Sequence, residues 1–277
     1  MPHELFAISL PLILLLLAGG ALTGILAGLF GIGGGTLLVP LLYEVTRRSG
    51  IPPEFQMQVA IGTSLAIIAP TALVSYFGHR KKKAGDEALL RFWRLPVLCG
   101  VVAGTLLAAY TPALFLKILF AFVCGGTALR LVFDPQGRWR LGSEMPRGAA
   151  LKGQGFGIGM LSAMLGLGGG IFSTLLMTLY NRPIHQAVAT SAGIGVIVAA
   201  PAAVGYMIVG YHHAQGFPLW CIGFVSLLAV IFIAPLSSFF APYGVKLAHH
   251  FKKRQLEIAF AIYLLLIAAR FFVSLLQ

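Results

Sequence analysis

Long apolar runs, separated by short polar stretches, make up most of this chain. Most of these runs have no polar face, and about 20 apolar residues suffice to cross the hydrocarbon core of a bilayer. The pattern predicts an all-α polytopic membrane protein with about 8–10 membrane segments. We expect these segments at 5–30, 36–46, 57–78, 92–110, 112–133, 149–166, 171–181, 185–209, 217–241 and 255–276.

Two of the apolar runs contain three consecutive glycines. The first triplet lies in GIGGG at 31–35, the second lies in GLGGG at 166–170, and a short apolar piece follows each. Glycine weakens a helix, and lipid cannot hydrate the backbone groups that a break exposes. Close helix packing is the simpler interpretation of any single glycine. Two triplets at matching places favour a functional break in each helix.

A second motif recurs in the same order as the glycine triplets. AIGTS at 60–64 matches AVATS at 187–191, and a proline follows each, Pro70 and Pro201. Matching motifs in matching segments indicate two homologous halves. We therefore expect one transmembrane domain, 1–277, with repeat 1 at 1–133, a basic connector at 134–150 and repeat 2 at 151–277.

Composition and charge agree with a membrane protein. Hydrophobic residues make up 58% of the chain and charged residues 10%, against roughly 25% charged residues in soluble domains, and the mean hydropathy is +0.90. The net charge of +12 comes mainly from basic residues in short loops. That distribution is typical of cytoplasmic loops near anionic lipid, and it argues against nucleic acid as a partner.

The basic loops also predict how the halves are oriented. The 79–94 loop is strongly basic and goes to the cytoplasm, whereas its counterpart at 210–216 has no Lys or Arg and goes outside. Equivalent loops on opposite faces indicate inverted repeats, each with an odd number of crossings and with both termini outside. Arg47 and Arg48 then fall on the outer face, against the usual charge bias.

The glycine breaks predict an anion site built from the backbone. A short helix that starts within the membrane exposes its first N–H groups and the positive end of its dipole, and glycine lets a ligand approach them. The hydroxyls of the Thr-Ser (TS) pairs that end AIGTS and AVATS can donate further hydrogen bonds to an anion, although a bond to their own helix is an equal alternative. The candidate substrate-binding residues are Gly33, Gly34, Gly35, Thr36, Thr63, Ser64, Gly168, Gly169, Gly170, Ser173, Thr190 and Ser191.

The positions of the charged side chains favour an anionic substrate. The acidic residues, Glu44 among them, are expected in loops or at segment ends, and intramembrane carboxylates are what many cation-coupled carriers use. His185 is a candidate proton or anion relay, although a loop histidine without a ligand role is the simpler interpretation. We expect Arg270 to snorkel to the interface, with a guard on an anion path as the alternative.

The sequence offers no signature of an enzyme. We find no nucleophile–base pair, no HExxH and no metal-ligand spacing, and Cys99, Cys124 and Cys221 lie singly in apolar runs. We therefore expect no enzyme activity, no cofactor and no metal. The expected partners are a small anionic substrate and membrane lipid, and assembly into a homo-oligomer stays open.

At these motifs the chain resembles the TauE/SafE family, also called sulfite exporters. The resemblance rests on GLFGIGGGTLLVPLL at 28–42, GLGGGIFSTLL at 166–176, the two TS motifs and the charged loop midway. It implies a multi-pass carrier in the inner (plasma) membrane that exports sulfite, sulfoacetate or other organosulfonates. Ile171 stands where repeat 1 has Thr36, so the two helix starts differ in side chains. An anion channel that uses the same glycine amides is the alternative.

Overall fold

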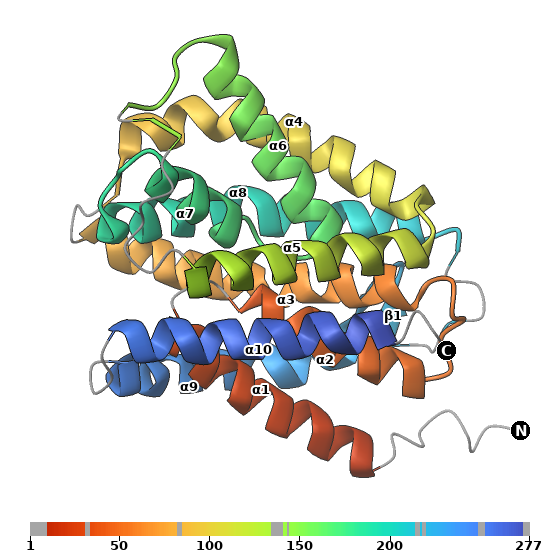
Figure 1. The fold of residues 1–277 in the computed structure, drawn as a ribbon. Coiled ribbons are helices and arrows are strands. Elements are labelled where there is room, and N and C mark those ends of the chain that lie inside the picture. Colours follow the sequence, from red (N-terminus) through yellow and green to blue (C-terminus); the bar gives the residue numbers. More distant parts are fainter. Residues whose placement is uncertain are drawn as a thin grey trace, which may run out of the picture.

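The computed structural model describes residues 10–30, 34–81, 85–133, 141–142, 144–213, 217, 220–248 and 253–273. Helices account for most of these residues (Figure 1). The elements are α1 (Leu10–Phe30), α2 (Gly35–Arg48), α3 (Gln56–Lys81), α4 (Glu87–Tyr110), α5 (Ala113–Phe133), α6 (Ala149–Leu165), α7 (Gly170–Leu179), α8 (Ile184–Gly210), β1 (Cys221–Ile222), β2 (Val225–Ser226), α9 (Leu227–Ala248) and α10 (Lys253–Val273).

The all-α membrane fold predicted from hydropathy is confirmed. Within the described part of the chain, five helices are long and apolar enough to cross a membrane: α3, α4, α5, α8 and α9. Large apolar side chains stand exposed on their outer sides, for example Phe122 of α5 at 74% and Ile231 of α9 at 65%. Such surfaces are disfavoured in water, and lipid is their natural environment.

The apolar run expected as one segment at 217–241 forms a hairpin and a helix instead. β1 and β2 pair antiparallel, and α9 begins only at Leu227. Gly223 makes the turn with a left-handed φ of 55°, and it lies against the carbonyl oxygen of Met207 in α8. The N–H of Phe224 donates to the carbonyl oxygen of Tyr206 at 3.1 Å. Contacts with α8 therefore hold an apolar hairpin where hydropathy alone predicts helix.

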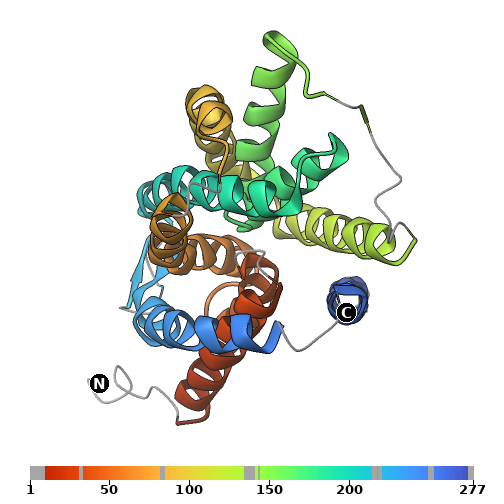
Figure 2. The same ribbon diagram turned by 90° about the vertical axis from the view of Figure 1, so that its left-hand side faces the viewer.

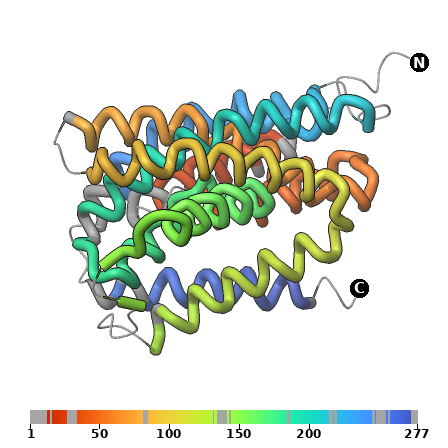
Figure 3. The backbone as a smooth tube through the Cα atoms, turned by 90° about the horizontal axis from the view of Figure 1, so that it is seen from above, coloured from red at the N-terminus to blue at the C-terminus, as the bar shows by residue number. Residues whose placement is uncertain are grey.

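The two halves of the chain are interleaved. The first helix of each half packs against the fourth helix of the other, α1 on α9 and α6 on α4, while α3 packs on α8 and α5 on α10. The paired helices α3 and α8 run in opposite directions, as do α5 and α10 (Figures 1 and 3). Interpretation of the halves as inverted repeats, with the domain limits given above, stays a prediction.

The helix pairs differ in how they contribute to the core. Helices α3 and α8 lie at its centre, where Ile61, Leu65, Ile194 and Val198 are fully buried. The α5–α10 pair lies at the edge, with α10 standing apart from most of the other helices (Figure 2). The central pair is therefore the framework on which the two short helices, α2 and α7, are placed.

Candidate functional site

Both predicted helix breaks are confirmed. α1 ends at Phe30 and α2 begins at Gly35, while α6 ends at Leu165 and α7 begins at Gly170. The residue before each short helix is a glycine in the left-handed region, Gly34 with φ 71° and Gly169 with φ 81°. Side chains with a Cβ rarely adopt this conformation, which explains a glycine at each of these two positions.

The two breaks touch each other at the centre of the molecule. A Cβ on Gly35 would lie 2.8 Å from the carbonyl oxygen of Gly166 and 2.8 Å from the Cα of Leu167. Gly35 therefore permits a backbone contact between the two halves. Thr36 is buried beside it at 3% exposure. Gly33 lies outside the described residues.

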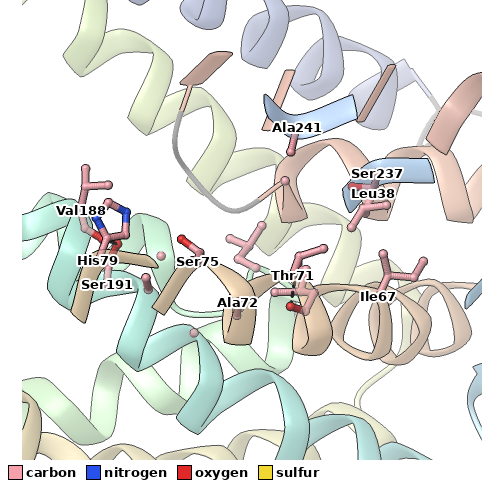
Figure 4. Close-up of a pocket in the computed structure, with 17 residues that line it drawn as sticks. Leu38, Ile67, Thr71, Ala72, Ser75, His79, Val188, Ser191, Ser237 and Ala241 are labelled. Carbon is pink, nitrogen blue, oxygen red and sulfur yellow. Dashed lines mark hydrogen bonds between the residues drawn. The ribbon is translucent and has the colours of Figure 1, made fainter. Parts of the chain in front are cut away.

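A cavity of about 240 Å³ lies beside the meeting point of the breaks (Figure 4). Its volume is several times the roughly 30 Å³ that one water occupies in the liquid, so a small organic or inorganic anion has room. The start of α2, the break before α7, and the helices α3, α8 and α9 line it. Gly34, Gly168, Gly170 and Ser191 are the predicted site residues that the structure brings together around this space.

The cavity extends from the breaks toward the end of α3. Thr71, Ser75 and His79 line it from α3 and Ser191 lines it from α8, with Ser237 of α9 on another wall. Among the wall residues that the structure describes, none is acidic and none is Lys or Arg. The polar groups at this wall are therefore neutral hydroxyls, the His79 imidazole and backbone groups at two helix N-termini. The hydroxyls of Thr71 and Ser191 donate to carbonyl oxygens of their own helices, Ile68 and Val188, both at 2.8 Å.

The α3 wall was missed at the sequence level, although its spacing was visible there. Ile67, Thr71, Ser75 and His79 follow each other at intervals of four residues, which places them along one face of a helix. Three polar residues in such a row, inside an apolar segment, are the signal that identifies this wall.

Thr63 and Thr190, the threonines of the repeated Thr-Ser pairs, form hydrogen bonds with the residues just before α9 and α4. Thr63 Oγ1 accepts a hydrogen bond from the N–H of Ser226 at 2.9 Å. Thr190 Oγ1 accepts one from the N–H of Asp86 at 2.8 Å. Ser226 and Asp86 each come directly before one of these helices and accept a hydrogen bond from its first turn. Neither threonine lines the 240 Å³ cavity.

The three predicted serines make different contacts. Ser64 Oγ donates to the carbonyl oxygen of Gly166 in the opposite break, at 2.9 Å. Ser173 Oγ donates to the carbonyl oxygen of Gly169 at 2.6 Å, and Ser191 Oγ donates to that of Val188 at 2.8 Å, both within or at the start of their own helix. Of these three serines, Ser191 alone lines the cavity.

Comparison with known proteins places the chain in a family. The model of the family described as "Sulfite exporter TauE/SafE" matches residues 16–271. The chain belongs to the TauE/SafE family. A probable membrane transporter protein of Haemophilus influenzae is 30% identical over 269 residues, which cover 95% of this chain and 98% of the relative. Another, of Methanocaldococcus jannaschii, is 26% identical over 254 residues, 91% of each chain.

A third relative extends the same picture. A probable membrane transporter protein of Bacillus subtilis is 27% identical over 219 residues, 69% of this chain and 77% of the relative. No solved structure gives a significant match. The family and these relatives support a multi-pass membrane transporter, and the glycine breaks and the cavity are features of this TauE/SafE chain's own structure.

His185 and Arg270 are two further residues of interest in this TauE/SafE protein. The backbone of His185 belongs to the first turn of α8, and its side chain lies outside the described residues. Arg270 is 67% exposed, and its Nη2 lies 2.7 Å from Oε2 of Glu44, so snorkelling to the interface stays a prediction. Glu44, expected at a segment end, is a buried residue in the last turns of α2.

Proposed function

We propose that this protein is a secondary carrier that exports small sulfur-containing oxyanions, such as sulfite, sulfoacetate or other organosulfonates, across the inner (plasma) membrane. The observation that carries the proposal is the cavity at the junction of two helix N-termini, whose described lining residues supply neutral hydroxyls and include no carboxylate. The family description, sulfite exporter, supplies the class of substrate.

The first turns of α2 and α7 would hold the anion. The N–H groups of Leu37 and Leu38 donate to the carbonyl oxygen of Gly34, and that of Ser173 donates to Gly169. The amides that come earlier in each helix, such as those of Gly35 and Gly170, precede the first intrahelical bond. These amides and the positive ends of the two helix dipoles favour a negative charge without a buried Lys or Arg.

The walls of the cavity would strengthen this binding. Leu38, Ile67, Ile68 and Val188 surround the polar groups with apolar surface. Hydrogen bonds to a charged group are stronger in such surroundings than in water, because the local dielectric constant is lower. The same apolar walls give the carbon chain of an organosulfonate a favourable contact.

The different contacts of Ser64 and Ser191 support alternating access. In the first half of α3, which begins at Gln56, Ser64 donates a hydrogen bond to the Gly166 carbonyl, and the surrounding residues are packed. Its counterpart Ser191 in α8 borders the cavity instead. Aromatic side chains cover the packed side, where the rings of Phe55 and Phe224 lie 5.6 Å apart. We infer that the cavity belongs to an inward-facing state and that exchange of the two serine contacts accompanies the outward-facing state.

Inverted repeats would make that exchange a near-symmetric one. The support is the order of the motifs, the matching of α1 on α9 with α6 on α4, and the opposite directions of α3 and α8. Transporters built in this way bind substrate at the interface between their repeats and rock one part against the other. The Thr63–Ser226 and Thr190–Asp86 bonds would keep the neighbouring helices together during that motion.

A ligand screen tests the proposed substrate class. The purified protein is heated with sulfite, sulfate, thiosulfate, sulfoacetate, taurine or simple carboxylates, because an anion that binds the folded state raises its apparent stability. We expect sulfite or an organosulfonate to raise the melting temperature more than carboxylates of equal charge. Equal shifts for all anions would contradict the substrate class. Transport that carries a large electrical current, well above carrier turnover, would indicate the anion channel instead.

A further inference from the structure

The buried carboxylate of Glu44 forms ion pairs with three arginines where the last turns of α2 and α10 meet. Oε1 of Glu44 lies 2.7 Å from Nη2 of Arg48 and 3.3 Å from Nη2 of Arg47. Oε2 of Glu44 lies 2.7 Å from Nη2 of Arg270. The carboxylate thereby fixes three guanidinium groups, from two helices far apart in the sequence, at one place.

A fourth cation, from the first turns of α5, contacts the residue of α2 that precedes Glu44. Nζ of Lys117 lies 4.7 Å from the ring centroid of Tyr43, the residue before Glu44. We call these charged residues the Glu44 cluster. Its members are Glu44, Arg47, Arg48, Lys117 and Arg270.

The Glu44 cluster has an excess of positive charge that faces outward. Four cations and one carboxylate leave a net charge of +3 (4 − 1). The side chain of Glu44 is 11% exposed, whereas those of Arg47, Arg48 and Arg270 are 55%, 62% and 67% exposed. Each guanidinium has five N–H donors in a planar fork, so donors that do not reach Glu44 remain available to an oxyanion.

Exposed apolar side chains continue from this cluster along α5 and α10. On α5, Leu114 is 56% and Ile118 is 42% exposed, and on α10, Leu266 is 65% exposed. In a membrane protein such a surface contacts acyl chains, and cations at its end lie at the depth of the headgroups. Phosphate oxygens suit guanidinium forks in geometry and charge.

The geometry points to the Glu44 cluster as a binding site for the phosphate of an anionic phospholipid. The lipid's headgroup contacts the guanidinium groups of α2 and α10, and its acyl chains lie on the exposed apolar face of α5 and α10. The site is at the end of the molecule opposite the start of α4 (Figure 1). The α5–α10 pair lies at the periphery (Figure 2), and a lipid bound at this site braces the pair against α2. This site is separate from the cavity and does not depend on the proposed substrate.

Native mass spectrometry of the detergent-purified full chain tests this site. The protein is titrated with phosphatidylglycerol or with phosphatidylcholine of the same acyl chains, and retained lipid is counted. We expect tight retention of phosphatidylglycerol only. The double variant Arg47→Gln, Lys117→Gln leaves Arg48 and Arg270 on Glu44 and should bind phosphatidylglycerol about thirtyfold more weakly, since each basic side chain near an anionic lipid contributes about 1 kcal/mol.

The control is a double variant at two exposed arginines of α4, Arg91→Gln and Arg94→Gln, which should retain wild-type affinity. If the first double variant does not elute as a single folded species, Lys117→Gln alone replaces it, with a smaller expected loss. Equal retention of both lipids, or an equal loss in the α4 control, overturns the proposal. Displacement of the lipid by low concentrations of inorganic phosphate also overturns it, because the site would then bind free oxyanions.

Discussion

Ser64 donates a hydrogen bond from its Oγ to the carbonyl oxygen of Gly166, at 2.9 Å, and so joins the TS motif of one half to the glycine break of the other. The carbonyl of Gly166 also lies against Gly35, which begins α2. One hydroxyl thus holds the place where both breaks meet. Its counterpart Ser191 makes no such bridge and donates to Val188 at 2.8 Å. This difference separates the packed side of the centre from the cavity side.

Replacing Ser64 with alanine should destabilise the packed side. Ser64 Oγ is fully buried, and its loss leaves the Gly166 carbonyl without this donor, at a cost of about 1–3 kcal/mol. We expect a lower melting temperature and a higher reactivity of a cysteine placed near Phe55 toward an outside reagent. Thr127→Ala, which removes a bond to the residue's own helix, serves as control and should change neither. An unchanged melting temperature in Ser64→Ala would contradict the bridge.

Ser191 and Thr63 should respond differently to the same substitution. Ser191→Ala removes a cavity-wall hydroxyl that would turn from the Val188 carbonyl to the anion, and it should weaken anion binding by about 1.5–3 kcal/mol, the scale of a hydrogen bond to a charge. Thr63→Ala removes the acceptor of the Ser226 N–H and should lower stability while leaving affinity unchanged. Calorimetric titration of the anion, with thermal unfolding in parallel, distinguishes the two. Equal losses of affinity would place both residues at the ligand.

The ion pairs of Glu44 should contribute to stability. Glu44→Gln removes the charge shared by Arg48 and Arg270, and hydrogen bonds to charged groups are worth about 1.5–3 kcal/mol. We expect a clear fall in the melting temperature. Glu144→Gln is the matched control, since that carboxylate is 84% exposed and lies 4.0 Å from Arg147, and exposed pairs contribute little. An equal fall of the melting temperature in both variants would show that the Glu44 ion pairs contribute no more to stability than an exposed pair does.

Cysteine labelling tests the predicted orientation of the halves. His212→Cys lies just after α8 and should react with a membrane-impermeant reagent from outside, whereas Arg80→Cys lies near the end of α3 and should react from inside only. Both residues are exposed, so access to the reagent is limited by the membrane. Reaction of both cysteines from the same side would exclude inverted repeats.

Much of the fold follows from hydropathy and glycine placement, because lipid forces apolar runs into helices and leaves few alternatives. The breaks at Gly34 and Gly169 were predictable, since three glycines in a row oppose any continuous helix. The hairpin before α9 was not, because its apolar strands are too short to differ from the helix that follows them. Their conformation depends on contacts between Phe224 and Tyr206 that only the folded chain provides.

The candidate site was predicted only in part, because it too depends on contacts that only the folded chain provides. Repetition of the Thr-Ser pairs indicated that Thr63 and Thr190 matter, but a sequence does not give the positions of their partners, Ser226 in β2 and Asp86 before α4. Hydroxyls in a membrane segment suggest a ligand and a structural bond equally well. The spacing of Thr71, Ser75 and His79 on α3 was the stronger indication of a wall, and it needed only the helical period.

The most direct test of the central claim is anion flux in proteoliposomes containing an Ala192→Leu variant. Ala192 lines the cavity, and a leucine there would occupy the space beside Ser191 that the anion needs. Gly126→Leu on α5 is the control, because a Cβ at Gly126 would meet nothing within 4 Å. We predict that Ala192→Leu abolishes flux and anion binding while Gly126→Leu preserves both. Full flux through folded Ala192→Leu would contradict the assignment of the cavity as the path of the anion.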